Sequence, residues 1–273
     1  MKIVSLGVLA LIVLLLACAT TGPGGQKSLI IIPTSQELAI GQGMAKQVQT
    51  TDTVLADSSW QNYVDRVGQK IVSVCDRTDI DYHFTVIQSD QVNAFATPGG
   101  YLFIYTGLLR DMDNEGELAA VMAHEVSHVV ARHGIKRLQA SLGVAMAYQL
   151  AFGKDAGRSL NTAISAGMGL IFAGYSRDNE READRYGIYY MEKAGYDPHA
   201  AVTMFEKLSA LGGSSGSVYE HLTSDHPETA ERIQNAKTEI DGMGKLPSNL
   251  TLGEKKYREM AKRLPPPTAS KKK

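Results

Sequence analysis

The chain has 273 residues, a formal charge of -1 at pH 7, and 44% apolar residues. Its length fits one large domain or two small ones. The near-zero charge gives no basic footprint for a polyanion, which argues against nucleic acid as a partner.

The N-terminus has the pattern of a targeting segment. Lys2 precedes an apolar run over residues 3–17, which is short for a membrane-spanning helix and fits the hydrophobic region of a signal peptide. The run ends Leu15-Leu16-Ala17-Cys18, which resembles a bacterial lipobox. That resemblance implies cleavage after residue 17 and lipid attachment to Cys18. An ordinary secretory signal or an uncleaved anchor are the alternatives.

Residues 18–33 are then expected to tether a domain to its lipid anchor, because the segment is rich in Gly and Thr. Lipid chains hold a protein at a membrane without a spanning helix. Ala19, rather than aspartate, follows the cysteine, which resembles the outer-membrane default of bacteria with two membranes. We therefore expect an outer-membrane lipoprotein that faces the periplasm.

Two helices are predicted next along the chain. Thr34 and Glu37 have the spacing of a capping box, which predicts a helix to about Val48. Asp57, followed by two serines, predicts the start of a second helix. The apolar residues of this second helix recur at helical spacing: Tyr63, Val67, Ile71 and Val74.

A small sheet is predicted between residues 82 and 105. Residues 82–88 alternate in polarity and predict a strand. Residues 93–96 and 101–105 flank Pro98-Gly99-Gly100, a pattern typical of a hairpin with a Gly-rich turn.

Residues 114–132 are predicted to form a helix that Asp113 or Asn114 caps and that ends before Gly134. Residues 141–174 are rich in Ala, Gly, Leu and Met, and each half is too short to span a bilayer. We favour buried helices here over a membrane-facing flap. Three further helices are predicted at 177–193, at 197–211 and from Pro227 to about Ile240.

The segment His124-Glu125-Val126-Ser127-His128 is the HExxH signature. On a helix, the two histidines project from one face and suit two vertices of a tetrahedral zinc site. Glu125, between them, is placed as a general base. Burial of these side chains in an apolar helix would be costly without a partner, and a metal resolves that cost.

A third protein ligand is needed. Metzincins use a third histidine six residues after the second, but His133 falls one position early and would continue round the helix, so we interpret it as structural. The alternative is a carboxylate from a second helix, as in gluzincins, and Glu180 is the candidate. Asp184, one turn on, can accept a hydrogen bond from a ligand imidazole. Glu182 points elsewhere and is expected to form a salt bridge.

Together these elements resemble the HtpX-like and CAAX-prenyl-endopeptidase-like zinc metallopeptidases, which are gluzincins, and most closely their soluble periplasmic members. The likeness covers about residues 35–240. It rests on residues 123–128, 175–184, 225–227 and 231–233, and residues 93–100 are similar to the strand that precedes the active-site helix of that family.

The resemblance implies roles for several residues. Glu180 would be the third ligand of one Zn²⁺ per chain. His226 would stand near the zinc, either stabilising the oxyanion or capping the metal, and Arg232 would lie close to the site. A peptide substrate would lie along the predicted edge strand, in contact with Asn93, Ala94, Phe95 and Ala96.

We therefore expect an α+β fold that is predominantly helical, with a small antiparallel or mixed sheet beside the HExxH helix. The metallopeptidase domain would span residues 34–245, followed by a C-terminal extension at 246–273 with a flexible tail. The leading hypothesis is a zinc endopeptidase that cleaves unfolded or misassembled cell-envelope proteins, with envelope assembly machinery as a further partner. The alternatives are a chaperone-like assembly factor with a latent or structural zinc site, and a metal-independent structural lipoprotein.

Overall fold

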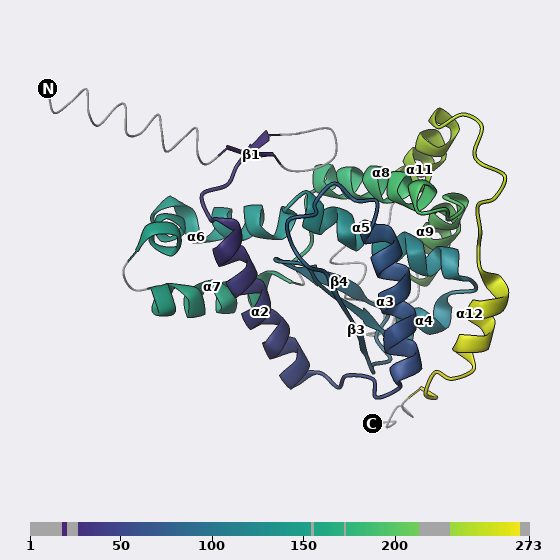
Figure 1. Ribbon diagram of the computed structural model, residues 1–273, viewed down its shortest axis with the longest axis horizontal. Coiled ribbons are helices and arrows are strands. Elements are labelled where there is room, and N and C mark those ends of the chain that lie inside the picture. Colours follow the sequence, from purple (N-terminus) through teal and green to yellow (C-terminus); the bar gives the residue numbers. More distant parts are fainter. Residues whose placement is uncertain (1–17, 21–26, 154–155, 172, 213–229, 268–273) are drawn as a thin grey trace, which may run out of the picture.

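The computed structural model of the chain describes residues 18–20, 27–153, 156–171, 173–212 and 230–267 (Figure 1). The predicted signal peptide at 1–17, His226 and the tail at 268–273 lie outside the described residues. The described part is mostly helical and includes a three-stranded sheet, which confirms the expected α+β class.

The sheet is mixed and has the order β3-β5-β4. β3 (His83–Ile87) runs parallel to β5 (Tyr101–Tyr105), whereas β4 (Ala94–Thr97) pairs with β5 as the predicted antiparallel hairpin. The hairpin turn requires glycine at residue 100, because φ there is +92° and a Cβ would lie 2.3 Å from the carbonyl oxygen of Asp81. Because β4 pairs only with β5 in this order, it is an outer strand of the sheet.

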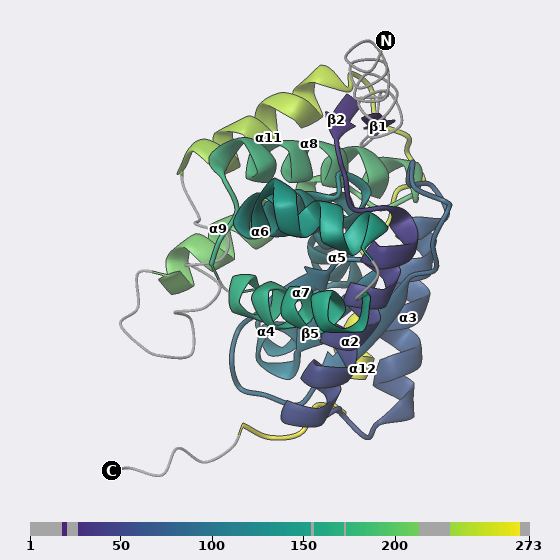
Figure 2. The ribbon, with the colours of Figure 1, turned by 90° about the vertical axis from the view of Figure 1, so that its left-hand side faces the viewer.

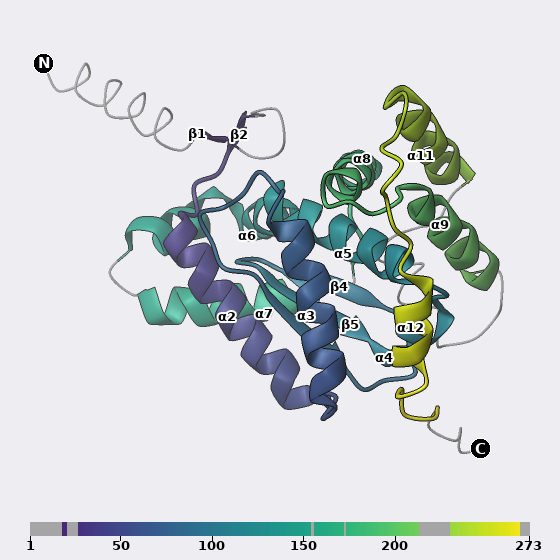
Figure 3. The same cartoon turned by 45° about the vertical axis from the view of Figure 1, so that its right-hand side comes forward.

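Two long helices pack on the sheet (Figure 3). α3 (Ser58–Val72) begins as predicted, with the Asp57 side chain accepting a hydrogen bond from the backbone N–H of Ser59. α2 (Thr34–Thr51) begins as predicted, but no side chain caps it, so the predicted capping box does not form. Glu37 is instead 1% exposed, where it forms ion pairs with Arg77 and Arg132.

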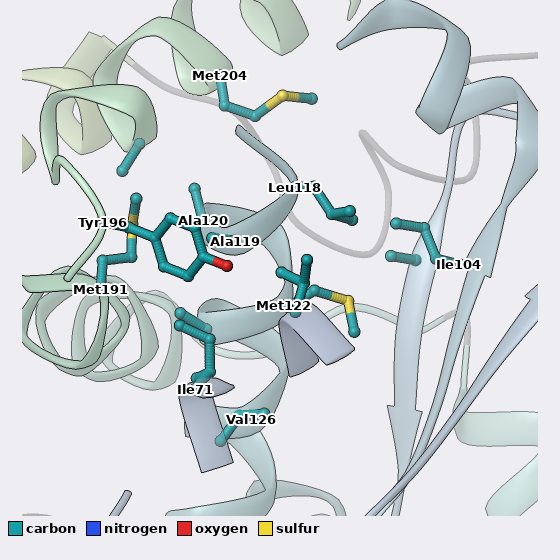
Figure 4. Packing of buried hydrophobic residues seen from close by; sticks show 14 of the residues in the cluster. Ile71, Ile104, Leu118, Ala119, Ala120, Met122, Val126, Met191, Tyr196 and Met204 are labelled. Carbon is teal, nitrogen blue, oxygen red and sulfur yellow. The ribbon is translucent and has the colours of Figure 1, made fainter. Parts of the chain in front are cut away.

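The HExxH segment lies on α5 (Glu115–Val130), which follows the short helix α4 (Thr106–Asp111) and runs through the centre of the molecule. The Asn114 side chain caps α5 by accepting a hydrogen bond from the Glu117 N–H. Figure 4 shows its apolar residues packed among Ile71, Ile104 and Met191 from other elements. Nearly every residue of α5 is buried, as expected for a core helix.

α5 ends at Val130, two residues before the predicted end and ahead of Gly134 as expected. The expected role of Gly134 at the break is taken by Arg132, which has a left-handed conformation with φ of 55°. α6 (His133–Phe152) starts immediately afterwards, so Gly134 lies in its first turn. The break between α5 and α6 therefore occurs at a charged residue rather than at a glycine.

Helices α6 and α7 (Ala156–Leu170) pack against each other and on α2 (Figure 2). Of the apolar residues in this region, Ala147, Leu150 and Ala163 are buried, but Val144, Tyr148 and Phe152 are exposed. The expectation of buried helices is thus met on one face. Within the described ranges, every helix is too short or too polar to cross a membrane.

On the other side of α5, α8 (Arg177–Lys193) packs along it and matches its predicted bounds. α9 (His199–Gly212) and α11 (Ala230–Gly242) cover α5 and α8 (Figure 3). α12 (Glu254–Ala261) returns to the core, where the Tyr257 hydroxyl donates a 2.6 Å hydrogen bond to the Leu109 carbonyl. At the N-terminal end, β1 (Cys18–Thr20) pairs antiparallel with β2 (Lys27–Leu29).

Candidate metal centre

Helices α5 and α8 bring three metal-binding side chains together. The Nε2 atoms of His124 and His128 lie 3.1 Å apart. The two carboxylate oxygens of Glu180 are each 3.5 Å from one of these nitrogens. All three side chains are buried, and they are the one such group of His, Cys, Asp or Glu in the described part of the chain.

The spacing of these atoms fits a tetrahedral zinc ion. Zinc bonds of about 2.0–2.1 Å place neighbouring ligand atoms roughly 3.3 Å apart. The distances of 3.1 and 3.5 Å lie on either side of that value. Two imidazoles and a carboxylate are also a donor set typical of zinc sites with one position left for water or substrate.

The electrostatics favour a cation at this place. Burial opposes protonation of His124, but the carboxylates of Asp184 and Glu180 outweigh it and raise the pKa of the imidazole to about 10. The surroundings of His124 therefore stabilise positive charge, which a bound metal would supply.

Asp184 holds the far side of the first histidine. Its Oδ1 lies 2.9 Å from His124 Nδ1, and Arg232 on α11 donates two 2.7 Å hydrogen bonds to the same carboxylate. Burial would raise the pKa of Asp184, but Arg232 and His124 outweigh burial and hold the pKa below its ordinary value. A charged carboxylate therefore orients the ring of His124.

A glycine allows the two helices to approach each other closely at the site. A Cβ on Gly187 of α8 would lie 3.2 Å from the backbone nitrogen of His124. Gly187 thus brings α8 close enough for Glu180 and Asp184 to reach the histidine rings.

Glu125 is 4% exposed. It lies on a narrow cavity between α5, α9 and α11, next to His124 and Arg232. The remaining lining is apolar: Ala94, Leu108, Ala120, Val121, Met204, Phe205 and Leu208.

The predicted substrate strand lies beside this helix, since β4 packs on α5. Asn93 uses its carbonyl to accept a hydrogen bond from the Tyr105 N–H, and Phe95 stacks on Phe103 with ring centroids 5.0 Å apart. In an antiparallel ladder every second residue bonds to the partner strand. The register therefore points the backbone N–H and C=O groups of Ala94 and Ala96 away from β5.

A family model described as "Peptidase family M48" matches residues 58–240. The chain belongs to peptidase family M48. This confirms the resemblance to the zinc metallopeptidases that the motifs indicated.

Relatives of this M48 chain include proteases named after different roles. It is 31% identical over 217 residues to the "Beta-barrel assembly-enhancing protease" of Escherichia coli K12, a match that covers 76% of this chain and 44% of that protein. It is 35% identical over 173 residues to the "Mitochondrial metalloendopeptidase OMA1" of Schizosaccharomyces pombe, covering 63% of this chain and 50% of that protein. "Metalloprotease YcaL" of Escherichia coli K12 is 26% identical over 225 residues, covering 81% and 86%. The chain thus spans about half the length of the first two.

Two neighbours of the M48 site were not anticipated. The Tyr175 ring stacks on His128 with centroids 4.2 Å apart. His133, which was expected to point away, has its Nδ1 2.9 Å from that of His128. Glu182, which was expected to form a salt bridge, has its Oε2 3.0 Å from Nε2 of His133. His226 lies outside the described residues, whereas Arg232 contacts Asp184 and Glu180.

Proposed function

We propose that this M48 chain is a zinc-dependent endopeptidase with one zinc per chain, held by His124, His128 and Glu180. The proposal rests on the buried convergence of these three side chains, with Glu125 on the same helix as the histidines. Zinc in such a site is a Lewis acid that polarises a carbonyl and makes water acidic near neutral pH. A structural zinc site has no use for Glu125, so its presence favours catalysis.

The chain's own residues would perform the proton transfers. The Glu125 carboxylate accepts a proton from the attacking water and passes it to the nitrogen of the leaving amine. His226 either donates a hydrogen bond to the developing oxyanion or caps the metal in a latent state. Arg232 neutralises the two buried carboxylates Asp184 and Glu180 and so keeps them in place.

Substrate would bind in extended form against β4. The outward-pointing backbone groups of Ala94 and Ala96 can pair with a peptide strand, next to α5 and Glu125. Main-chain pairing tolerates many side chains but requires an unpaired strand. This favours unfolded or misassembled polypeptides over folded ones.

The location we propose is the outer membrane, with Cys18 lipidated and the domain in the periplasm. The lipobox-like segment before Cys18 supports this, and so does the relative named for enhancing beta-barrel assembly. Envelope assembly machinery is accordingly the partner we propose. Mass spectrometry of the N-terminal peptide, with Cys18→Ser as control, tests the lipid: a lipid-modified Cys18 supports the anchor, and an unmodified one rules it out.

Cleavage of unfolded casein by wild type and Glu125→Gln tests the activity. We expect the variant to keep one zinc per chain and lose cleavage, since only the base is removed. Glu254→Gln, an exposed change on α12, should cleave like wild type. Equal cleavage by Glu125→Gln and wild type would contradict the proposed endopeptidase activity. Zinc-loaded wild type that binds unfolded chains without cleaving them would favour the chaperone-like alternative.

A further inference from the structure

His128 has a second nitrogen that faces away from Glu180. Its Nδ1 lies 2.9 Å from the Nδ1 of His133, and the Nε2 of His133 lies 3.0 Å from Oε2 of Glu182. The side chains of the two histidines are 1% and 0% exposed. A row of three side chains, of which the two histidines are buried and Glu182 is partly exposed, therefore leads from the candidate metal centre to α8.

The row requires one arrangement of protons. A neutral imidazole that offers Nε2 to a metal keeps its proton on Nδ1. The Nδ1–H of His128 then donates to His133 Nδ1, so His133 carries its own proton on Nε2. That N–H donates to Glu182, whose carboxylate is an acceptor. Each contact thus has one donor and one acceptor.

The turn at Arg132 makes this contact possible. In an uninterrupted helix, residues five apart point about 140° away from each other. The left-handed Arg132 breaks the helix, and its guanidinium is held by a 2.6 Å ion pair with the buried Glu37. Because of this break, the ring of His133 lies beside that of His128.

We propose that His133, held by Glu182, is a positioning residue that fixes the tautomer and the ring orientation of His128. It does for His128 what Asp184 does for His124. α8 then contributes a carboxylate to each part of the centre: Glu180 to the metal, Asp184 to the first histidine and Glu182, through His133, to the second. The inference rests on the proposed function in assuming that His128 binds zinc.

Zinc affinity, measured by chelator competition on the full chain, tests this role. His133→Phe keeps a ring of similar size but no acceptor, and we expect it to weaken zinc binding by about 10- to 100-fold. His133→Asn places an oxygen near the lost acceptor and should recover much of that loss. His199→Phe removes a surface histidine that pairs with Asp197 and should bind zinc like wild type.

Two further readouts separate positioning from simple packing. Urea unfolding of the metal-free variants reports a purely structural role, which would change stability but leave zinc affinity intact. Nitrogen-15 NMR of the zinc-loaded wild type should show His128 protonated at Nδ1 and His133 protonated at Nε2. This measurement tests the proposed tautomers even if His133→Phe does not fold. Zinc affinity of His133→Phe within about threefold of wild type, or the opposite tautomer at His133, overturns this inference alone. Wild type that binds no zinc overturns the proposed function with it.

Discussion

The Nδ1 atom of His124 lies 2.9 Å from the Oδ1 atom of Asp184, within hydrogen-bonding distance. The same carboxylate accepts two hydrogen bonds from Arg232, so residues of α8 and α11 fix a ring on α5. None of these elements is adjacent in the chain. The geometry of the candidate metal centre therefore depends on how α8 packs on α5 and how α11 packs on α8.

Asp184→Ala should destabilise the metal-free protein by about 3–5 kcal/mol, because it removes the closest partner of the buried Arg232. Urea unfolding measures the change. Asp178→Ala on the same helix is the matched control, since that side chain is 90% exposed, and it should shift stability by less than about 0.5 kcal/mol. Equal stability of the two variants would show that the buried pair contributes nothing to the fold.

Arg132→Gly and Arg132→Ala should both destabilise the protein, because each removes the ion pair with Glu37. The alanine variant should be the less stable of the two by about 1 kcal/mol, since a left-handed φ of 55° is strained for a residue with a Cβ. Urea unfolding of both variants at one pH checks the order. An alanine variant as stable as the glycine variant would contradict the left-handed turn.

Sequence patterns predicted what depends on neighbouring residues. The HExxH pair, the bounds of α8 and the hairpin at Gly99-Gly100 all follow from local periodicity or turn chemistry. Glu37 was misassigned to a capping box because its partners Arg77 and Arg132 lie far along the chain.

The contact between His133 and His128 was missed for a related reason. No local signal marks Arg132 as left-handed, since residues other than glycine favour right-handed conformations. Without that turn, helical spacing carries His133 away from the centre. Tertiary contacts, here the ion pair with Glu37, override the local preference.

Glu115 should make stability depend on acid pH. Burial would raise the pKa of Glu115, but hydrogen bonds from Arg66, Tyr63 and Tyr196 outweigh it and hold the pKa below its ordinary 4.5. The stability that ionised Glu115 contributes is complete above pH 4.5, where the carboxyl is also ionised in the unfolded chain. This stability is lost as the pH falls through the lower pKa of the folded state.

Glu115→Gln should therefore destabilise the metal-free protein most near neutral pH, and the difference from wild type should narrow below pH 4.5. Urea unfolding of both proteins across the acid range measures this difference. A difference that stays constant across the range would show that the folded pKa is not lowered.

Free zinc should raise the melting temperature of the metal-free protein, because it binds the folded state. At a hundred times the dissociation constant the gain is about 2.7 kcal/mol. Glu180→Ala should lose most of this gain, whereas Glu125→Gln should keep it. Calorimetry with and without zinc compares the three proteins, and the same gain in Glu180→Ala would remove that residue from the metal centre.

The X-ray absorption spectrum at the zinc edge of the purified full chain shows whether His124, His128 and Glu180 hold the metal. We expect one zinc per chain with two imidazole nitrogens and a carboxylate oxygen at about 2.0–2.2 Å. Zinc without imidazole scattering, or with a sulfur ligand near ~2.3 Å, would contradict this assignment.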